Sequence, residues 1–170
     1  MNLVIWNLKI RLLHWLMALF VILNLFVFDE GNDVHFWIGY GALALILIRV
    51  FIGFRSNGYE AFKKFPLNLS ELVNFLKNLF RRDHKDYVGH NPAAAYAYIS
   101  FWILVVTLGF TGVLLVHVDT FWGDQLLEEI HNIAADCVIV FIVIHFTGIL
   151  LDSILHKRKA WISMITGFKS

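Results

Sequence analysis

Four histidines interrupt the most apolar stretches of this 170-residue chain, and they are the first candidates for chemistry. They are His14, His35, His131 and His145. An ionisable side chain inside a bilayer is costly, and where one occurs it usually serves a function. Because the neutral imidazole ring is also the commonest protein ligand of metal ions, these positions indicate metal binding within a membrane.

The composition predicts the elements that must position these side chains. The chain is 59% hydrophobic and only 16% charged, whereas soluble domains average about 25% charged residues. The runs long enough to cross a hydrocarbon core of about 30 Å cover residues 8–28, 35–54, 92–117 and 124–156. Each must be helical, since the bilayer offers no water to satisfy the backbone, and the period-two alternation of a barrel is absent. We therefore expect one all-α integral membrane domain over residues 1–170, a four-helix transmembrane bundle.

The distribution of charge predicts how this bundle is oriented. All 14 Lys and Arg fall at the start of the first run, at the end of the second, between the second and third, or after the fourth. The two opposite loops carry only acidic charges, which are Asp29, Glu30, Asp33, Asp119, Asp124, Glu128 and Glu129. Because positive residues are retained in the cytoplasm, both termini and the long loop are expected on that side.

The long loop contains a further segment, residues 70–82, whose large apolar residues recur at helical spacing. These residues are Leu72, Phe75, Leu76, Leu79 and Phe80. With Ser70 as its N-cap, the segment is predicted to form an amphipathic helix that lies on the cytoplasmic surface of the membrane. A solvated loop helix is the alternative, and it accounts less well for so many apolar residues on one side.

This topology pairs the four histidines by depth. His131 and His145 are fourteen residues apart in one run, so they return to within about 40° of each other and lie ~21 Å apart along the helix axis. One is therefore outer and the other inner. His14 shares the inner depth with His145, and His35 shares the outer depth with His131. Each pair comes from two helices, as a flat cofactor held between helices requires.

The cofactors that this arrangement predicts are two haems, each with two histidine ligands. Bis-imidazole iron has no open coordination position, which suits electron transfer and disfavours O₂ binding. The chain has one cysteine, Cys137, and no Cys-x-x-Cys-His motif. Both haems are therefore expected to be non-covalent, b-type groups.

Other interpretations of the histidines stay open at this point. A single intramembrane histidine can form a hydrogen bond between helices or lie at the headgroup level, as His35, close behind Asp33, would do. A zinc site is a further alternative, but it needs four ligands at one depth where this chain offers two. If the histidines bind no haem, the chain is expected to be a membrane anchor or a transporter.

Residues near the ligands are candidates for further cofactor contacts. Gly39 and Gly148 lie one turn after His35 and His145, where a small residue leaves room for a haem. Haem propionates are anionic, and Arg49 is the expected partner of the inner one, with Arg11 as a second candidate. The alternative for Arg49 is a side chain that extends to the headgroups.

His90 precedes the third run and is a surface residue by default. It is also a candidate contact of a haem propionate or a quinone.

Several motifs along the chain resemble those of bacterial cytochrome b561 and of nickel-hydrogenase cytochrome b subunits. They are RLLHW (11–15), HFWIGYGALALILIRVFIGF (35–54), GHNP (89–92), EEIHNIA (128–134), the spacing of His131 and His145, and MITG (164–167). The resemblance implies a four-helix membrane cytochrome with two b haems, and it assigns the axial ligands to the same four histidines.

The resemblance also implies a function in a bacterial inner membrane. Such a protein passes electrons between the quinone pool and a periplasmic redox partner, here expected to be a c-type cytochrome. It contacts membrane lipid, does not bind nucleic acid, and its self-association is left open. We expect an electron-transfer protein rather than a stand-alone enzyme.

The alternative is a superoxide:quinone oxidoreductase, as in a stand-alone member of the family. A cationic outer face would favour that activity, and this chain has no Lys or Arg there.

Overall fold

The computed structural model describes residues 4–79, 87–155, 157 and 159–168. Its long helices are α1 (Leu8–Phe26), α2 (Asp33–Arg55), α4 (Pro92–His117) and α5 (Gln125–Leu155). Its shorter elements are η1 (Phe62–Lys64), α3 (Leu69–Asn78), η2 (Asp119–Phe121), η3 (Ala160–Ile162) and α6 (Ser163–Thr166). The four long helices are each long and apolar enough to cross a membrane, so the predicted all-helical transmembrane architecture is confirmed.

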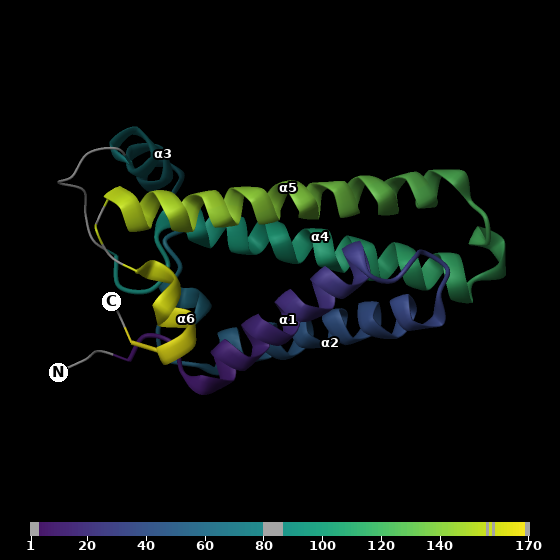
Figure 1. Ribbon diagram of the computed structural model, residues 1–170, viewed down its shortest axis with the longest axis horizontal. Coiled ribbons are helices and arrows are strands. Elements are labelled where there is room, and N and C mark those ends of the chain that lie inside the picture. The colour runs from purple at the N-terminus through teal and green to yellow at the C-terminus, as the bar shows by residue number, and fades with distance from the viewer. Residues whose placement is uncertain (1–3, 80–86, 156, 158, 169–170) are drawn as a thin grey trace.

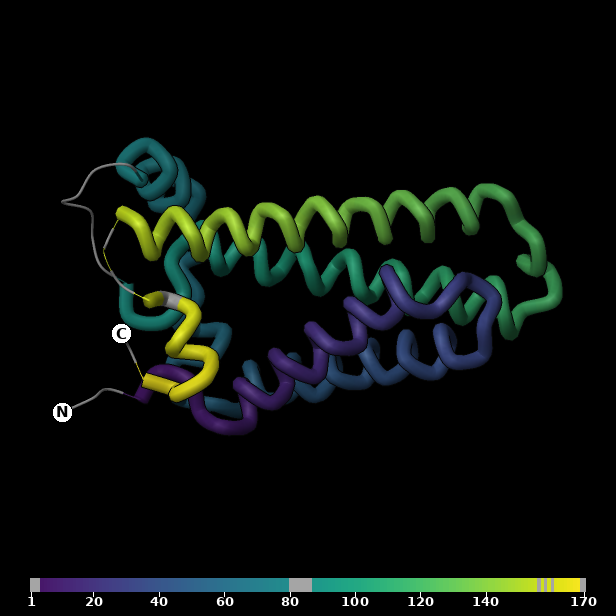
Figure 2. Tube along the Cα trace, viewed as in Figure 1, coloured from purple at the N-terminus to yellow at the C-terminus, as the bar shows by residue number. Residues whose placement is uncertain are grey.

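The long helices form two antiparallel hairpins that lie against each other (Figure 1). In one hairpin α1 packs on α2, in the other α4 packs on α5, and α2 joins the two by packing on α4. The connections α1–α2 and α4–α5 lie at one end, which we call the η2 end (Figure 2). The other end carries α3, α6 and the start of α1, and we call it the α6 end.

Local sequence explains where the long helices begin. The Asn91 side chain accepts a hydrogen bond from the Ala94 amide at 2.8 Å, with Pro92 at the first helical position of α4. Asp124 accepts one from the Leu127 amide at 2.9 Å at the start of α5. Each helix therefore begins at a residue type that commonly caps helices.

The helix bounds differ slightly from the predicted runs. Because the Asn32 side chain caps α2, this helix begins at Asp33 and His35 lies in its first turn. Helix α1 ends at Phe26, two residues before the predicted end of its run. The last residue of the fourth run, His156, lies outside the described residues.

Helix α3 occupies most of the predicted amphipathic segment, but the predicted cap was wrong. Asn68, not Ser70, caps the helix, because its side chain accepts from the amides of Ser70 and Glu71 at 2.9 and 3.4 Å. Helix α3 packs on α4 with one face and leaves Leu69, Val73 and Leu76 exposed. Residues 80–82 of the predicted segment lie outside the described residues.

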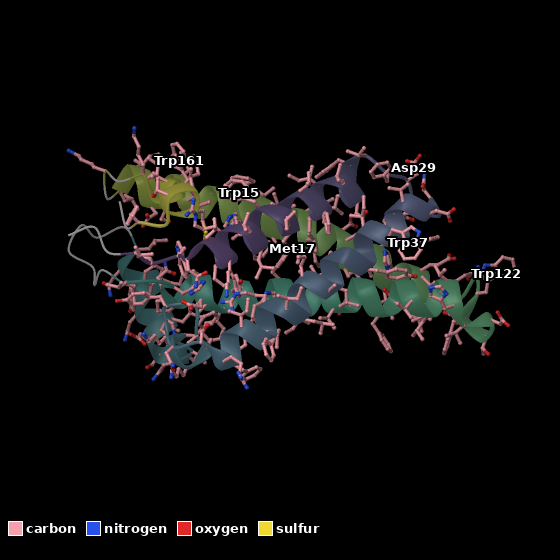
Figure 3. All side chains as sticks on the ribbon, turned by 90° about the horizontal axis from the view of Figure 1, so that it is seen from below. Trp15, Met17, Asp29, Trp37, Trp122 and Trp161 are labelled. Carbon is pink, nitrogen blue, oxygen red and sulfur yellow. The ribbon has the colours of Figure 1, made fainter. Side chains whose placement is uncertain are left out.

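Exposed tryptophans lie toward both ends of the bundle (Figure 3). Trp37 and Trp122, which are 73% and 84% exposed, lie toward the η2 end, and Trp15 and Trp161 toward the α6 end. Such aromatic belts are typical of the two interfaces of a membrane protein.

The two ends of the described chain meet at the α6 end. The amides of Ile5 and Trp6 both donate to the carbonyl of Gly167, at 2.8 and 3.1 Å. Gly167 has φ +88°, and a Cβ there would lie 2.6 Å from the Trp6 carbonyl oxygen, so only glycine fits this approach. The indole N–H of Trp15 donates to the Met164 carbonyl at 3.1 Å, which ties α6 to the helix that carries His14.

Candidate metal centres

The structure brings the four histidines together as two facing pairs. At the α6 end, the rings of His14 on α1 and His145 on α5 have centroids 6.3 Å apart and planes inclined by 51°. At the η2 end, the rings of His35 on α2 and His131 on α5 have centroids 6.4 Å apart and planes inclined by 50°. Helix α5 therefore contributes one imidazole to each pair.

These separations can be compared with the size of a metal centre. A metal–imidazole nitrogen bond is about 2.0 Å and the ring centre lies roughly 1.1 Å beyond the nitrogen, so rings on opposite sides of one ion have centroids roughly 6.2 Å apart. The observed separations of 6.3 and 6.4 Å match this value. Each pair thus fits one metal ion between two axial imidazoles.

The described residues supply no further ligands. They contain no group of three or more His, Cys, Asp or Glu side chains that could hold a metal ion by themselves. A metal at either pair would need further ligands besides the two imidazoles. A haem fits this requirement, because its ring nitrogens leave the iron with two axial positions for the protein.

Two polar residues that the sequence did not single out as site residues hold the pair at the η2 end. Thr111 of α4 is 3% exposed, and its Oγ1 lies 2.8 Å from Nδ1 of His131. Asn24 of α1 donates from Nδ2 to the backbone carbonyl of His35 at 3.1 Å. Both contacts join different helices, so no spacing along one helix could have indicated them.

The two glycines predicted to make room for a cofactor differ in their surroundings. A Cβ at Gly39 would lie 3.4 Å from the Asn24 amide nitrogen, so this glycine faces α1. A Cβ at Gly148 would meet no atom within 4 Å, so open space adjoins α5 one turn beyond His145. Phe141 lies one turn before His145 and stacks on its ring, with ring centroids 6.1 Å apart and planes inclined by 11°.

Arg49 is buried inside the bundle and does not extend to the headgroups. It is 3% exposed, Nε donates to the Tyr98 hydroxyl at 2.9 Å, and Nη2 donates to the Glu60 carbonyl at 2.9 Å. Three aromatic rings surround its guanidinium, with centroids 5.3–5.6 Å away, and they belong to Phe62, Tyr98 and Trp102. The remaining nitrogen, Nη1, is buried without a hydrogen-bond partner. A buried cation with a free donor is suited to binding an anion.

His90 lies close to Arg49 among aromatic side chains, so the default expectation of a surface position was wrong. Its ring contacts those of Trp6, Phe65 and Tyr98 at 4.8, 4.5 and 5.3 Å. Burial, and then the charge of Arg49, lower the pKa of His90 from 6.5 to about 4. The ring is therefore neutral near pH 7, and its buried Nδ1 has no partner.

Arg11 is the third basic residue at the α6 end with an unused polar atom. Its Nε is buried without a partner. A Cβ at Gly167 would lie 3.3 Å from Nη1 of Arg11 and 2.6 Å from the Trp6 carbonyl, which places Arg11 beside the segment that contacts His90. Unpartnered nitrogens from α1, α2 and the segment before α4 thus lie at one end of the bundle.

The structure thus has four apolar helices long enough to cross a membrane and two facing imidazole pairs spaced to fit a metal ion. The chain belongs to the prokaryotic cytochrome b561 family, whose family model matches residues 5–167. Comparisons with curated proteins and with solved structures gave no significant match. The protein is accordingly a multi-pass membrane cytochrome that binds haem b and transfers electrons.

Proposed function

We propose that this chain binds two haem b groups, one at each histidine pair, and passes electrons between the quinone pool and a periplasmic partner. The observation that carries the proposal is the spacing of the pairs, 6.3 Å for His14 and His145 and 6.4 Å for His35 and His131. Both values fit a bis-imidazole iron. When bound, each haem supplies a one-electron redox centre.

The protein's own contribution is to hold the ligands rigidly at two depths. Because His131 and His145 belong to one continuous helix, the two centres keep a fixed separation of ~21 Å along its axis. His14 with His145, and His35 with His131, would each supply two imidazoles to a haem and so leave its iron no open position for O₂. This arrangement favours electron transfer over catalysis at the iron.

The basic residues at the α6 end support the placement of haem propionates there. Nη1 of Arg49 and Nε of Arg11 are buried donors without partners, and a propionate carboxylate would satisfy them. The Tyr98 hydroxyl and the Glu60 carbonyl hold the Arg49 guanidinium in place. The neutral ring of His90 is a candidate hydrogen-bond partner for a propionate or for a quinone oxygen.

The charge asymmetry supports an orientation with the α6 end in the cytoplasm and the η2 end in the periplasm of a bacterial inner membrane. In this orientation α3 lies at the cytoplasmic surface. Its exposed apolar residues, Leu69, Val73 and Leu76, would enter the lipid interface.

The periplasmic partner is proposed to be a basic c-type cytochrome. Around the η2 end, Asp29, Glu30, Asp33, Asp119, Glu128 and Glu129 are all exposed. His35 follows Asp33 by two residues, so the outer haem would lie close to this acidic surface. Complementary charge would therefore guide a basic partner to the haem.

The haem stoichiometry tests the proposal. Pyridine haemochrome and protein assays on the purified protein are expected to give two extractable haem b groups per chain. A ratio near one, or haem that stays attached after acid–acetone extraction, would overturn it.

A further inference from the structure

Thr111 makes a hydrogen-bond arrangement at the η2 end that has no counterpart at the other pair. Its Oγ1 lies 2.8 Å from Nδ1 of His131. The same oxygen lies 2.8 Å from the Thr107 carbonyl and 3.2 Å from the Leu108 carbonyl, both in its own helix. In the described part of the chain, no ring nitrogen of His14 or His145 is hydrogen-bonded to protein.

Proton counting assigns the direction of the Thr111–His131 hydrogen bond. A hydroxyl has one proton, and the carbonyl oxygens of Thr107 and Leu108 can only accept it. The hydroxyl oxygen of Thr111 therefore accepts, and Nδ1 of His131 donates. A neutral imidazole protonated at Nδ1 keeps its lone pair on Nε2, so Nε2 is the ligating atom.

We propose that Thr111 is a positioning residue of the outer haem site and that it lowers the reduction potential of that haem. This inference rests on the proposed assignment of His35 and His131 to one haem. A ligating histidine that donates its second N–H becomes more basic, and a more basic ligand stabilises oxidised iron. Because Thr111 is buried and bonded to its own helix, it also fixes the rotation of the His131 ring.

The test is a redox titration of Thr111→Val, which keeps the side-chain volume and removes the acceptor. The outer haem is expected to become easier to reduce by roughly three- to tenfold in its one-electron equilibrium, or about 30–60 mV, while the inner haem is unchanged. The matched control is Thr107→Val. That hydroxyl lies one turn earlier on the same helix and donates to the Ile103 carbonyl at 2.8 Å.

A second pair of variants separates the hydroxyl from the packing of its methyl group. Thr111→Ser and Thr111→Ala both lack the methyl, and only serine keeps the acceptor. We expect the serine variant to retain the wild-type potential and the alanine variant to shift like valine. If the variants without a hydroxyl lose the outer haem while serine retains it, the hydroxyl is needed to present Nε2, which also supports the inference. Equal potentials in Thr111→Val and Thr107→Val, or equal shifts in serine and alanine, would overturn it.

Failure of the underlying assignment would be recognised separately. The outer component is identified in the wild-type protein as the one that His131→Ala removes. If the wild-type protein holds one haem, or if His131→Ala removes neither component, the proposed function fails before any Thr111 variant is compared.

Discussion

The guanidinium of Arg49 donates from Nε to the hydroxyl of Tyr98 at 2.9 Å, so the positive charge of α2 is buried against α4. No carboxylate side chain contacts this guanidinium among the described residues. Glu60 accepts from it through the backbone, and the Glu60 carboxylate accepts from Asn7 at 3.3 Å instead. The site therefore retains a positive potential that acts on any redox centre nearby.

Replacing Arg49 with leucine is expected to lower the potential of the inner haem more than that of the outer one. Removing a positive charge makes oxidised iron relatively more stable. A unit charge about 10 Å from the iron at an effective dielectric of about 20 contributes roughly 1.7 kcal/mol, or on the order of 70 mV. Redox titration of both haems measures the shift.

Arg55→Leu is the matched control for this prediction. Arg55 ends the same helix but is exposed, so solvent screens its charge. Equal shifts at both haems, or a shift no larger than that of Arg55→Leu, would show that Arg49 has no special relation to the inner haem.

The two histidines of α5 provide a second prediction. His145→Ala is expected to remove the inner haem and leave the outer one, and His131→Ala to do the reverse, because each facing pair lies at its own end of the bundle. Haem content should fall from two per chain to one in each variant. Low-temperature absorption spectra then show which component remains. Two six-coordinate, low-spin haems in either variant would refute the pairing.

Short-range patterns in the sequence determine the long helices and most of their caps. The hydrocarbon core of a bilayer cannot satisfy the polar groups of the backbone, so long apolar runs form helices. Capping side chains such as Asn91 and Asp124 act within one turn. The long helices and these caps are therefore predictable from short stretches of sequence. The same reasoning chose the wrong cap for α3, because Ser70 and Asn68 are both good capping residues and only the structure shows which side chain accepts.

Contacts between helices were not predictable from the chain alone. Depth follows from counting residues, and it predicted which histidines share an end of the bundle. The rotation of each helix does not follow from counting, because apolar residues surround most of each transmembrane helix. For this reason Thr111 was not identified, and His90 was expected at the surface although it packs against Trp6 and Phe65.

The lowered pKa of His90 predicts a loss of stability in mild acid. Burial, and then Arg49, lower this pKa from 6.5 to about 4 in the folded protein. The folded state thus binds the proton less tightly than the unfolded state. The contribution of His90 to the free energy of unfolding is therefore fully present above about pH 6.5 and is lost as the pH falls toward 4. The total loss is about 3 kcal/mol.

Thermal unfolding in detergent between pH 7 and pH 4.5 measures this loss. His90→Phe keeps an aromatic ring and cannot titrate, so its transition should depend less on pH than that of the wild-type protein. The control is His117→Phe, which replaces an exposed histidine at the opposite end of α4 from His90. Parallel pH profiles for wild type and His90→Phe would contradict the prediction.

The meeting of the chain ends depends on Gly167. Gly167→Ala is expected to destabilise the protein by about 1–3 kcal/mol, because it combines a φ of +88° with a Cβ 2.6 Å from the Trp6 carbonyl oxygen. Gly123→Ala is the control, since Gly123 has φ +72° but open space around its Cβ. Thermal unfolding should show a larger loss for Gly167→Ala. Equal losses would mean that the contact with Trp6 contributes nothing.

The acidic surface at the η2 end predicts how the protein meets its electron partner. Complementary charge raises the rate of encounter, and salt screens it over a Debye length of about 8 Å at physiological ionic strength. Electron transfer to a basic c-type cytochrome, followed by stopped-flow absorption, should therefore slow as salt rises.

Replacing Asp29, Glu30 and Asp33 together with lysine should slow this reaction further at low salt. The competing explanation is that the orientation of the helices alone excluded cations from this face, and that the acids only keep the loops solvated. An acidic c-type cytochrome separates the two, because docking by charge predicts that the triple variant accelerates its reaction. A rate that is independent of salt and unchanged in the triple variant, with either cytochrome, would leave only the competing explanation.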